Sequence, residues 1–377
     1  MPSIAIIGTR GYPSYYGGFE TAVRKLAPFL ADQGWDVTVY CRPGATRLDD
    51  PGRDHRIHVV ETKGVERKSL STLTYGLTAA HDASKKKPDV ALVMNVANGY
   101  WLPLLKRAGI PTVVNVDGIE WDRAKWGKLA KWMFRMGAKL TAKYGTELVV
   151  DAHAIGDRWQ TDFDRGGVYL PYGGDKWAPL KTPIDLQRRR YVLMVARFVP
   201  ENSIVEFFDA VPSIAESAPV IIVGSTGYGG DLDQRARELA EAHSNVRWLG
   251  HVSDDELLAA LWQNCGAYFH GHTVGGTNPA LVQAMAAGAP VVAVDTVYNR
   301  EVLGDDSQTC ARDADSILES IDALLNDPAR QERMSRTNIR RADDQFSWDA
   351  ICRGYESTLR KVSCIAESAI GSSDEVR

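Results

Sequence analysis

The stretch HTVGGTNPALVQAM, residues 272–285, has residue types and a spacing suited to holding an anion. Asn278 is a good helix N-cap and Pro279 a good first helical residue. The free backbone N–H groups of the helix start would point toward Gly275-Gly276-Thr277, where an anion can approach closely. The pattern predicts a phosphate site that contains no acidic residue. The alternative is an ordinary loop-to-helix turn.

Two more features favour a diphosphate. Gly17 and Gly18 precede the first long helix, just after the first strand, and Arg197 stands at the end of the strand expected over 191–197. Open α/β sheets bind ligands at the carboxyl ends of their strands. Two helix N-termini and an arginine would therefore face one ligand. Taken alone, Arg197 is equally compatible with a surface or domain-interface position.

A dinucleotide site is weakly supported. The N-terminal glycines do not follow the G-x-G-x-x-G spacing, and the second strand ends in Tyr40-Cys41-Arg42 without an acid for a ribose. An NAD(P)-dependent oxidoreductase is therefore the weaker alternative.

Alternating strand and helix patterns predict an α/β protein with two Rossmann-like, doubly wound parallel domains facing across a cleft. We expect an N-terminal domain over 1–176, a C-terminal domain over 177–345, a helix over 346–362 that packs back on the first domain, and a disordered tail over 363–377. The expected strands cover 3–8, 36–41, 56–61, 90–95, 112–116, 147–150, 191–197, 220–224, 246–250, 267–271 and 290–294.

The composition excludes several classes of protein. The chain has 377 residues, a net charge of -4 and a mean hydropathy of -0.24. No apolar run approaches the ~20 residues of a spanning helix, and the five cysteines form no CxxC pair. We expect a cytoplasmic protein that binds no nucleic acid. His270 and His272 are the only metal candidates and fit a structural role better, so we expect no metal cofactor.

Residues 123–145 carry seven lysines and arginines and no acid. Apolar residues recur at helical spacing among them: Trp126, Leu129, Met133, Met136 and Leu140. A basic amphipathic helix suits an anionic membrane surface. The alternative is a helix that faces the core and whose solvated side happens to be basic.

Four segments together carry a resemblance to a known family: GTRGYPSYYGGFET, VVNVDGIEWDRAKW, VARFVPEN and VGGTNPALVQAM. The chain resembles family 4 glycosyltransferases of the GT-B fold, and within them bacterial rhamnosyltransferase-like enzymes of polysaccharide synthesis. The resemblance implies transfer of a sugar from a nucleotide diphosphosugar to a hydroxyl, with retention and without a metal. The implied donor is dTDP-rhamnose or another dTDP- or UDP-sugar, and the implied acceptor a saccharide or lipid-linked saccharide at the inner face of the plasma membrane.

The sequence departs from the family on the donor side. Many relatives carry two glutamates across this loop and helix, where the chain has Gly275 and Gln283. The basic residue that commonly follows Pro-Glu is Asn202 here. The resemblance still assigns these positions to donor binding, together with Arg197 and the loop 275–278, and implies altered donor recognition. A non-catalytic nucleotide-sugar-binding protein remains an alternative.

On the other side of the reaction, the resemblance places Asp117 where many relatives have a histidine near the reacting carbon, with Glu120 three residues on. A carboxylate there could accept the proton of the acceptor hydroxyl or stabilise an oxocarbenium-like transition state. The alternative is a loop carboxylate that caps the next helix. Residues expected on the acceptor side are Tyr15, Tyr16, Asn98, Tyr100 and Trp121.

Overall fold

The computed structural model describes residues 1–15, 17–47, 49–65, 68–123, 126–183 and 185–374, and its chain divides into two compact units. The first unit comprises Met1–Pro171 and Asp349–Arg377, and the second Tyr172–Trp348. Both boundaries differ by a few residues from those expected. Gly174 donates a backbone hydrogen bond to Phe346 (2.9 Å), which holds the two ends of the second unit together.

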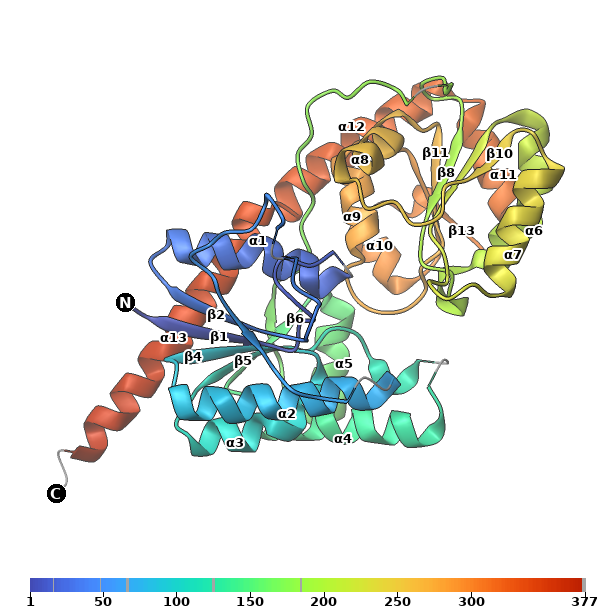
Figure 1. Ribbon diagram of the computed structural model, residues 1–377. Coiled ribbons are helices and arrows are strands. Elements are labelled where there is room, and N and C mark those ends of the chain that lie inside the picture. Colours follow the sequence, from blue (N-terminus) through green and yellow to red (C-terminus); the bar gives the residue numbers. More distant parts are fainter. Residues whose placement is uncertain (16, 48, 66–67, 124–125, 184, 375–377) are drawn as a thin grey trace. The chain divides into compact units, whose positions relative to one another are not determined.

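The first unit contains a seven-stranded sheet in which all pairs are parallel (Figure 1). In sheet order its strands are β3 (His58–Glu61), β2 (Asp36–Cys41), β1 (Ser3–Ile7), β4 (Val90–Met94), β5 (Thr112–Asn115), β6 (Glu147–Val150) and β7 (Val168–Tyr169). The strand order reverses between β1 and β4, so the polar segments that follow these two strands begin at the switch point of the sheet.

Helices cover both faces of this sheet, with α2, α3 and α4 along one face and α1 and α13 along the other (Figure 1). The helices of the unit are α1 (Gly18–Asp32), α2 (Lys68–Lys86), η1 (Val96–Trp101), α3 (Leu102–Arg107), η2 (Glu120–Asp122), α4 (Lys128–Tyr144), α5 (His153–Phe163) and α13 (Trp348–Asp374).

The second unit has a six-stranded parallel sheet with its own switch point between β8 and β11. In sheet order the strands are β10 (Val246–Trp248), β9 (Val220–Val223), β8 (Val192–Val195), β11 (Ala267–His270), β12 (Val291–Val294) and β13 (Thr309–Cys310). The helices are η3 (Pro200–Asn202), α6 (Ile204–Ser217), α7 (Asp231–Ala242), α8 (Asp255–Asn264), α9 (Pro279–Ala286), α10 (Val297–Leu303), η4 (Asp306–Gln308), α11 (Ala314–Leu325) and α12 (Pro328–Gln345).

Side chains of the second sheet alternate between two buried cores. Val192 and Met194 of β8 join the core beneath α6, α7 and α11, whereas Leu193 joins the core beneath α8, α9 and α10. Successive side chains of a strand point to opposite faces, and both faces are covered by helices. The continuous apolar runs seen in the sequence follow from this double burial. The predicted doubly wound parallel sheets are confirmed.

The sequence pattern did not predict the strands β7 and β13, and it wrongly predicted disorder for a segment that continues α13. The edge strands β7 and β13 have two residues each, too few for any periodicity to be seen. Residues 363–374 continue α13 rather than forming a disordered tail, and 375–377 lie outside the described residues. Adding residues to an existing helix is far easier than nucleating one, so a segment without apolar periodicity can still extend it.

The C-terminal helix contributes a buried polar contact to the first unit. The Asn115 side-chain amide at the end of β5 donates a hydrogen bond of 2.7 Å to the Tyr355 hydroxyl of α13. Both side chains are buried, and burial raises the pKa of Tyr355, so its hydroxyl stays neutral. This hydrogen bond joins α13, at the end of the chain, to β5 of the seven-stranded sheet.

Replacing Tyr355 with phenylalanine should leave the Asn115 amide without this partner in a buried place. We expect the free energy of unfolding to fall by about 1–3 kcal/mol, the usual cost of an unsatisfied buried group. Denaturant unfolding measures the loss, and hydrogen exchange should show faster opening of α13. Tyr228→Phe is the matched control because Tyr228 is 90% exposed. Equal stability of the two variants would contradict a role for this hydrogen bond.

Candidate functional site

The donor-side residues of the second unit gather at the switch point of its sheet. Arg197 follows β8 and His272 follows β11, and these two strands are neighbours. Arg197 is exposed, and its backbone carbonyl accepts hydrogen bonds from Val199 N (2.9 Å) and from the Asn202 side chain (2.8 Å). The chain therefore holds the Arg197 backbone in place while its guanidinium faces solvent.

The loop between β11 and α9 has the predicted helix start. Asn278 is the N-cap of α9, and its side chain accepts from Ala280 N at 3.0 Å, with Pro279 as the first helical residue. Gly275, Gly276 and Thr277 are buried directly before it. The arrangement gives α9 an ordered N-terminus of the kind that binds anions.

Gly275 shows why this loop has no glutamate. Its φ is +90°, in the left-handed region that side-chain-bearing residues rarely adopt. A glutamate at 275 would be strained in this backbone conformation.

Gln283 is engaged within the second unit. Its Oε1 accepts from the backbone N–H of Asp175 at 3.2 Å, and its Nε2 donates to Asp175 Oδ2 at 3.1 Å. A glutamate at this position would set two carboxylates against each other. Recognition of a ribose by Gln283 stays a prediction, whereas its contact with the segment that opens the second unit is observed.

Asn202 is buried, and both ends of its amide bond within the unit. The amide donates to the Arg197 carbonyl, and its Oδ1 contacts Nδ1 of His272. Any effect of Asn202 on a donor is therefore expected to act through these two neighbours. His272 is half-buried after β11, where it contacts Asn202, and the sequence pattern offered it only as a metal candidate.

The neighbouring His270 has a structural setting. It is buried, the Tyr268 hydroxyl lies 3.1 Å from its Nδ1, and burial lowers its pKa to about 3. The ring is thus neutral at physiological pH. In the part of the chain that the structure describes, no group of three or more His, Cys, Asp or Glu side chains is arranged to hold a metal ion.

At the start of α1 in the first unit, a carboxylate already occupies the loop. Glu20, in the first turn, is buried, and its Oε1 accepts from Arg10 N (3.0 Å) and Thr9 Oγ1 (3.4 Å). A donor phosphate at Gly17 and Gly18 would share this helix start with Glu20. Their donor role stays a prediction.

The two proposed catalytic carboxylates lie in different environments. Asp117 follows β5 with a φ of +55°, is half-buried, and its backbone N–H donates to Asn115 Oδ1 at 3.0 Å. Glu120 is buried, accepts from Trp126 Nε1 at 2.9 Å and forms an ion pair with Arg123 at 2.9 Å. The Glu120 carboxylate is therefore held in internal contacts, and a role of Asp117 as a base stays a prediction.

Two of the predicted acceptor-side residues make internal contacts in the first unit. Trp121 is buried against the rings of Trp159 and Phe163, and the Tyr100 hydroxyl donates to the Met133 carbonyl at 3.0 Å. These two residues have structural roles that their sequence pattern did not distinguish from ligand contacts.

Of the other three, the structure describes Tyr15 and Asn98. Tyr15 has the guanidinium of Arg24 3.9 Å and that of Arg47 5.0 Å from its ring centroid. Tyr16 lies outside the described residues. Asn98 is buried after β4, where it donates to the Met94 carbonyl at 2.7 Å.

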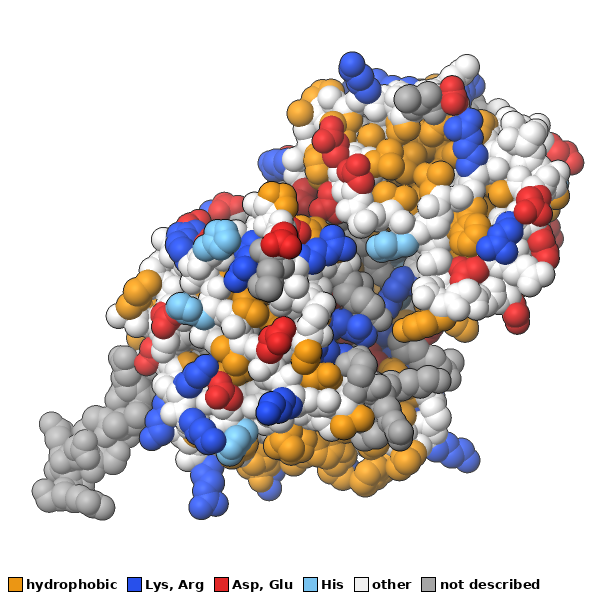
Figure 2. Space-filling view, viewed as in Figure 1, with side chains coloured by type: hydrophobic (Ala, Val, Ile, Leu, Met, Phe, Trp, Pro, Cys, Tyr) orange, Lys and Arg blue, Asp and Glu red, His pale blue; other side chains and the backbone are white. Residues whose placement is uncertain are grey.

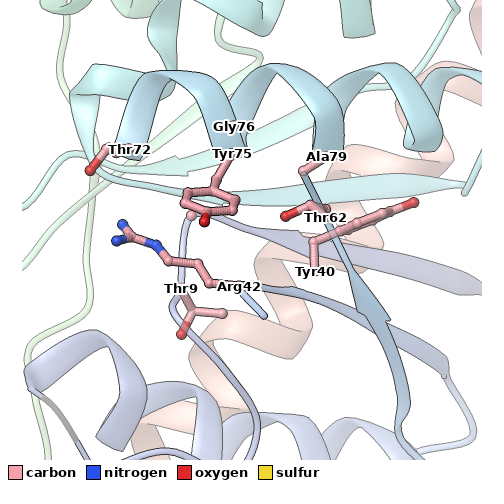
Figure 3. Close-up of a pocket in the computed structure, with 9 residues that line it drawn as sticks. Thr9, Tyr40, Arg42, Thr62, Thr72, Tyr75, Gly76 and Ala79 are labelled. Carbon is pink, nitrogen blue, oxygen red and sulfur yellow. The ribbon is translucent and has the colours of Figure 1, made fainter. Parts of the chain in front are cut away.

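A pocket next to Asn98 was not predicted (Figure 3). It lies at the carboxyl ends of β1, β2 and β3 and against α2. Its lining residues are Gly8, Thr9, Tyr40, Arg42, Thr62, Thr72, Tyr75, Gly76 and Ala79. The sequence signal for this pocket was Arg42 at the end of the second strand, which in the sequence only indicates that a ribose-binding acid is missing there.

Comparison with known proteins agrees with this two-unit architecture. Residues 181–341 match the family model for glycosyl transferases group 1, and residues 1–175 match a domain of unknown function (DUF1972). The structure is similar to sucrose-phosphate synthase from Thermosynechococcus elongatus, with a TM-score of 0.80 and 18% identity over 97% of this chain and 100% of that chain. The protein has the GT-B fold.

Two other comparisons extend over the GT-B chain. It is 26% identical to an MMP alpha-(1->4)-mannosyltransferase of Mycolicibacterium hassiacum, over 96% of this chain and 99% of the relative. Anabaena HepE in complex with UDP-glucose has a TM-score of 0.73 at 15% identity, with 96% of this chain and 100% of that chain covered. These similarities support a glycosyltransferase, but they do not support the rhamnosyltransferase-like subgroup.

The contact between Gln283 and Asp175 yields a direct test. Gln283→Glu should place two carboxylates at hydrogen-bond distance and lower stability by about 1–2 kcal/mol at neutral pH. The loss should shrink as the pH falls toward about 4, where carboxyl groups protonate. Thermal unfolding across this pH range measures both effects.

The matched control is the double variant Asp175→Asn with Gln283→Glu, which exchanges amide and carboxylate and should recover most of the stability. A double variant no more stable than Gln283→Glu alone would show that the observed pair does not govern this position. Titrations with dTDP and UDP on the same proteins test whether residue 283 also reads the ribose.

Proposed function

We propose that this protein is a retaining glycosyltransferase that moves a sugar from a nucleotide diphosphosugar to an acceptor hydroxyl. The observation that carries the proposal is the α9 N-terminus with its buried glycine loop, beside the exposed Arg197 at the neighbouring strand end. Backbone N–H groups and a guanidinium stabilise the negative charge of a departing diphosphate. No carboxylate of this loop opposes that charge.

In the proposed reaction, the bond between the sugar C1 and the donor phosphate oxygen breaks, and the nucleoside diphosphate leaves with the electron pair. The acceptor hydroxyl oxygen forms the new bond to C1 and loses its proton. Asp117 is the proposed acceptor of that proton, because it directly follows the end of β5 in the first unit, at the position that the family resemblance assigns to the reacting carbon. The helix start and basic side chains perform the role that a metal ion has in other transferases, so no metal is included in the proposal.

The donor sugar is the least constrained part of the proposal. The family resemblance favours L-rhamnose from dTDP-rhamnose, whereas the Mycolicibacterium relative is a mannosyltransferase and HepE was solved with UDP-glucose. A thermal-shift screen should therefore include dTDP-rhamnose, GDP-mannose and UDP-glucose, since a ligand at a hundredfold excess over its Kd stabilises by ~2.7 kcal/mol. Donor hydrolysis or sugar transfer distinguishes an enzyme from a non-catalytic nucleotide-sugar-binding protein.

The proposed acceptor is a saccharide or lipid-linked saccharide, and helix α4 is the proposed membrane contact. Its small residues Gly137, Ala138 and Thr141 are buried, whereas Leu129 and Trp132 are 72% and 59% exposed. Figure 2 shows hydrophobic side chains along the edge of the first unit where Figure 1 places α3 and α4, with basic side chains nearby.

Exposed Leu129 and Trp132 beside lysines fit an anionic bilayer surface better than a helix whose apolar residues are all internal. None of the helices that the structure describes meets the length and hydropathy needed to cross a bilayer. A place at the inner face of the plasma membrane stays a proposal.

Arg197→Ala should weaken binding of a nucleoside diphosphate by about 1.5–3 kcal/mol, the scale of hydrogen bonds to a charged group. Calorimetry with UDP and dTDP on the full chain measures the change. Arg237→Ala serves as the control and should bind as the wild type does, because Arg237 lies on α7 over the ring of Trp248 and follows neither β8 nor β11. Unchanged affinity in a folded Arg197→Ala protein would remove this residue from the donor site.

Charge reversal of Lys128, Lys131 and Arg135 to glutamate should abolish binding to anionic liposomes, because like charges on the helix and the bilayer repel. Binding of the wild type should fall as salt rises. Liposome sedimentation measures both effects, with the same reversal at Arg333, Arg336 and Arg340 of α12 as a control. Equal sedimentation of the wild type with neutral and anionic liposomes would contradict the proposal.

A further inference from the structure

An exposed tyrosine stands near a strand end of the second unit. Tyr228 lies in the glycine-rich segment between β9 and α7, and it is 90% exposed. Single exposed apolar residues are common on protein surfaces, so exposure alone assigns no role to this ring. The position of Tyr228 relative to the donor-side residues of the same unit is more specific.

The segment that carries Tyr228 is hydrogen-bonded to the segment that carries Arg197. β8 and β9 are neighbouring strands, and beyond their ends Phe198 N donates to the Ser225 carbonyl at 3.0 Å. Adjacent strands of a sheet lie about 4.8 Å apart, so the two segments leave the sheet side by side. Tyr228, three residues after Ser225, and Arg197, directly before Phe198, therefore belong to one edge of the second unit.

A tight turn presents the Tyr228 side chain to solvent. Gly227 and Gly229 have φ values of +83° and +66°, in the left-handed region. A Cβ at either glycine would meet no atom within 4 Å, so the backbone conformation rather than lack of space requires glycine here. Between them, Tyr228 N donates to Thr226 Oγ1 at 3.3 Å. The ring thus projects from a turn with a defined hydrogen bond.

The start of α7 already has its negative charge. The buried Asp233 carboxylate accepts from Thr226 N at 2.9 Å and from Gly230 N at 3.2 Å, and Asp231 lies in the same first turn. These carboxylates occupy the place where a helix N-terminus favours an anion. A phosphate is therefore not expected beside Tyr228, whereas an uncharged part of a ligand is compatible with this segment.

The next strand end is apolar as well. Beyond β9 and β10, Gly224 N donates to the Gly250 carbonyl at 2.6 Å, which joins the segments that follow these strands. Leu249, directly after β10, is 43% exposed, and Leu257 in the first turn of α8 is 36% exposed. This edge thus has exposed apolar side chains after β9 and β10. At β8 and at the start of α9 it has groups suited to an anion. A nucleoside diphosphate has the same division, with a flat base at one end and its charge at the other.

We propose that Tyr228 stacks on the nucleobase of the donor while Arg197 and the start of α9 hold its diphosphate. The inference rests on the proposed glycosyltransferase function and adds to it a residue that binds the base. Every nucleobase has a π-face, so stacking strengthens binding without selecting one base. Tyr228 is assigned as a binding residue, and base identity depends on other contacts.

The test is calorimetric titration of the full chain with UDP, dTDP and GDP, and the tightest of the three is then used with the variants. Tyr228→Ala should weaken that nucleotide at least about fivefold, the lower end of the effect of removing an aromatic ring from a base stack. Tyr228→Phe and Tyr228→Trp keep a ring and should bind within about twofold of the wild type. Unchanged affinity in Tyr228→Ala, or equal losses in the alanine and phenylalanine variants, would overturn the proposal.

Two further measurements separate a stack from an indirect effect on Arg197. Ile339→Ala removes a side chain of α12 in the same unit that is 39% exposed, and it should bind as the wild type does. The loss in Tyr228→Ala should be the same at low and high salt because the ring is uncharged. The loss in Arg197→Ala should shrink as salt rises. A Tyr228→Ala loss that shrinks in the same way would show that the substitution acts through Arg197, and it would overturn the assignment of Tyr228 to the base.

The same titrations keep this inference distinct from the function itself. A folded wild-type protein that binds none of UDP, dTDP and GDP would refute the glycosyltransferase proposal. Nucleotide binding that depends on Arg197 but not on Tyr228 would support the donor site and refute only the base contact.

Discussion

Parallel pairing of strands places all carboxyl ends of a sheet at one edge, and both sheets in the described chain are parallel throughout. The polar segments after the strands are therefore brought together even where they are far apart in sequence. At the two switch points, between β1 and β4 and between β8 and β11, the following loops diverge and leave room for a ligand. In the second unit, Arg197 and His272 follow the two strands at the switch point. In the first unit, Gly8 and Asn98 do so.

The scarcity of carboxylates around α9 is tied to its local geometry. Gly275 has a backbone conformation that a glutamate would strain, and the Gln283 amide makes two hydrogen bonds with Asp175 that a carboxylate could not both make. Position 275 thus has no side chain, and at position 283 a neutral amide bonds to Asp175. Negative charge near the helix N-terminus is left for a ligand to supply, which is the electrostatic basis for proposing a diphosphate there.

In the first unit, residues that look equivalent in the sequence have different contacts in the structure. Asp117 and Glu120 are three positions apart, yet Glu120 is bound by Trp126 and Arg123 while Asp117 stands in a left-handed turn at the strand end. Trp121 belongs to an aromatic core with Trp159 and Phe163. Arg42 belongs to a pocket because α2 brings Tyr75 and Ser71 against it.

The sequence alone was sufficient to predict the strands of four residues or more and the N-cap of α9. The reason is that apolar runs, Asn278 and Pro279 act over a few neighbouring positions. It was also sufficient for the two parallel sheets, since repeated strand–helix units allow few other arrangements. It could not locate the edge strands β7 and β13, whose two residues carry no periodicity. The roles of Gln283, Asn202, Glu120 and Arg42 depend on partners such as Asp175, His272, Trp126 and Tyr75. Those partners are selected by long-range packing, and a side chain's availability for chemistry depends on whether such a partner already holds it.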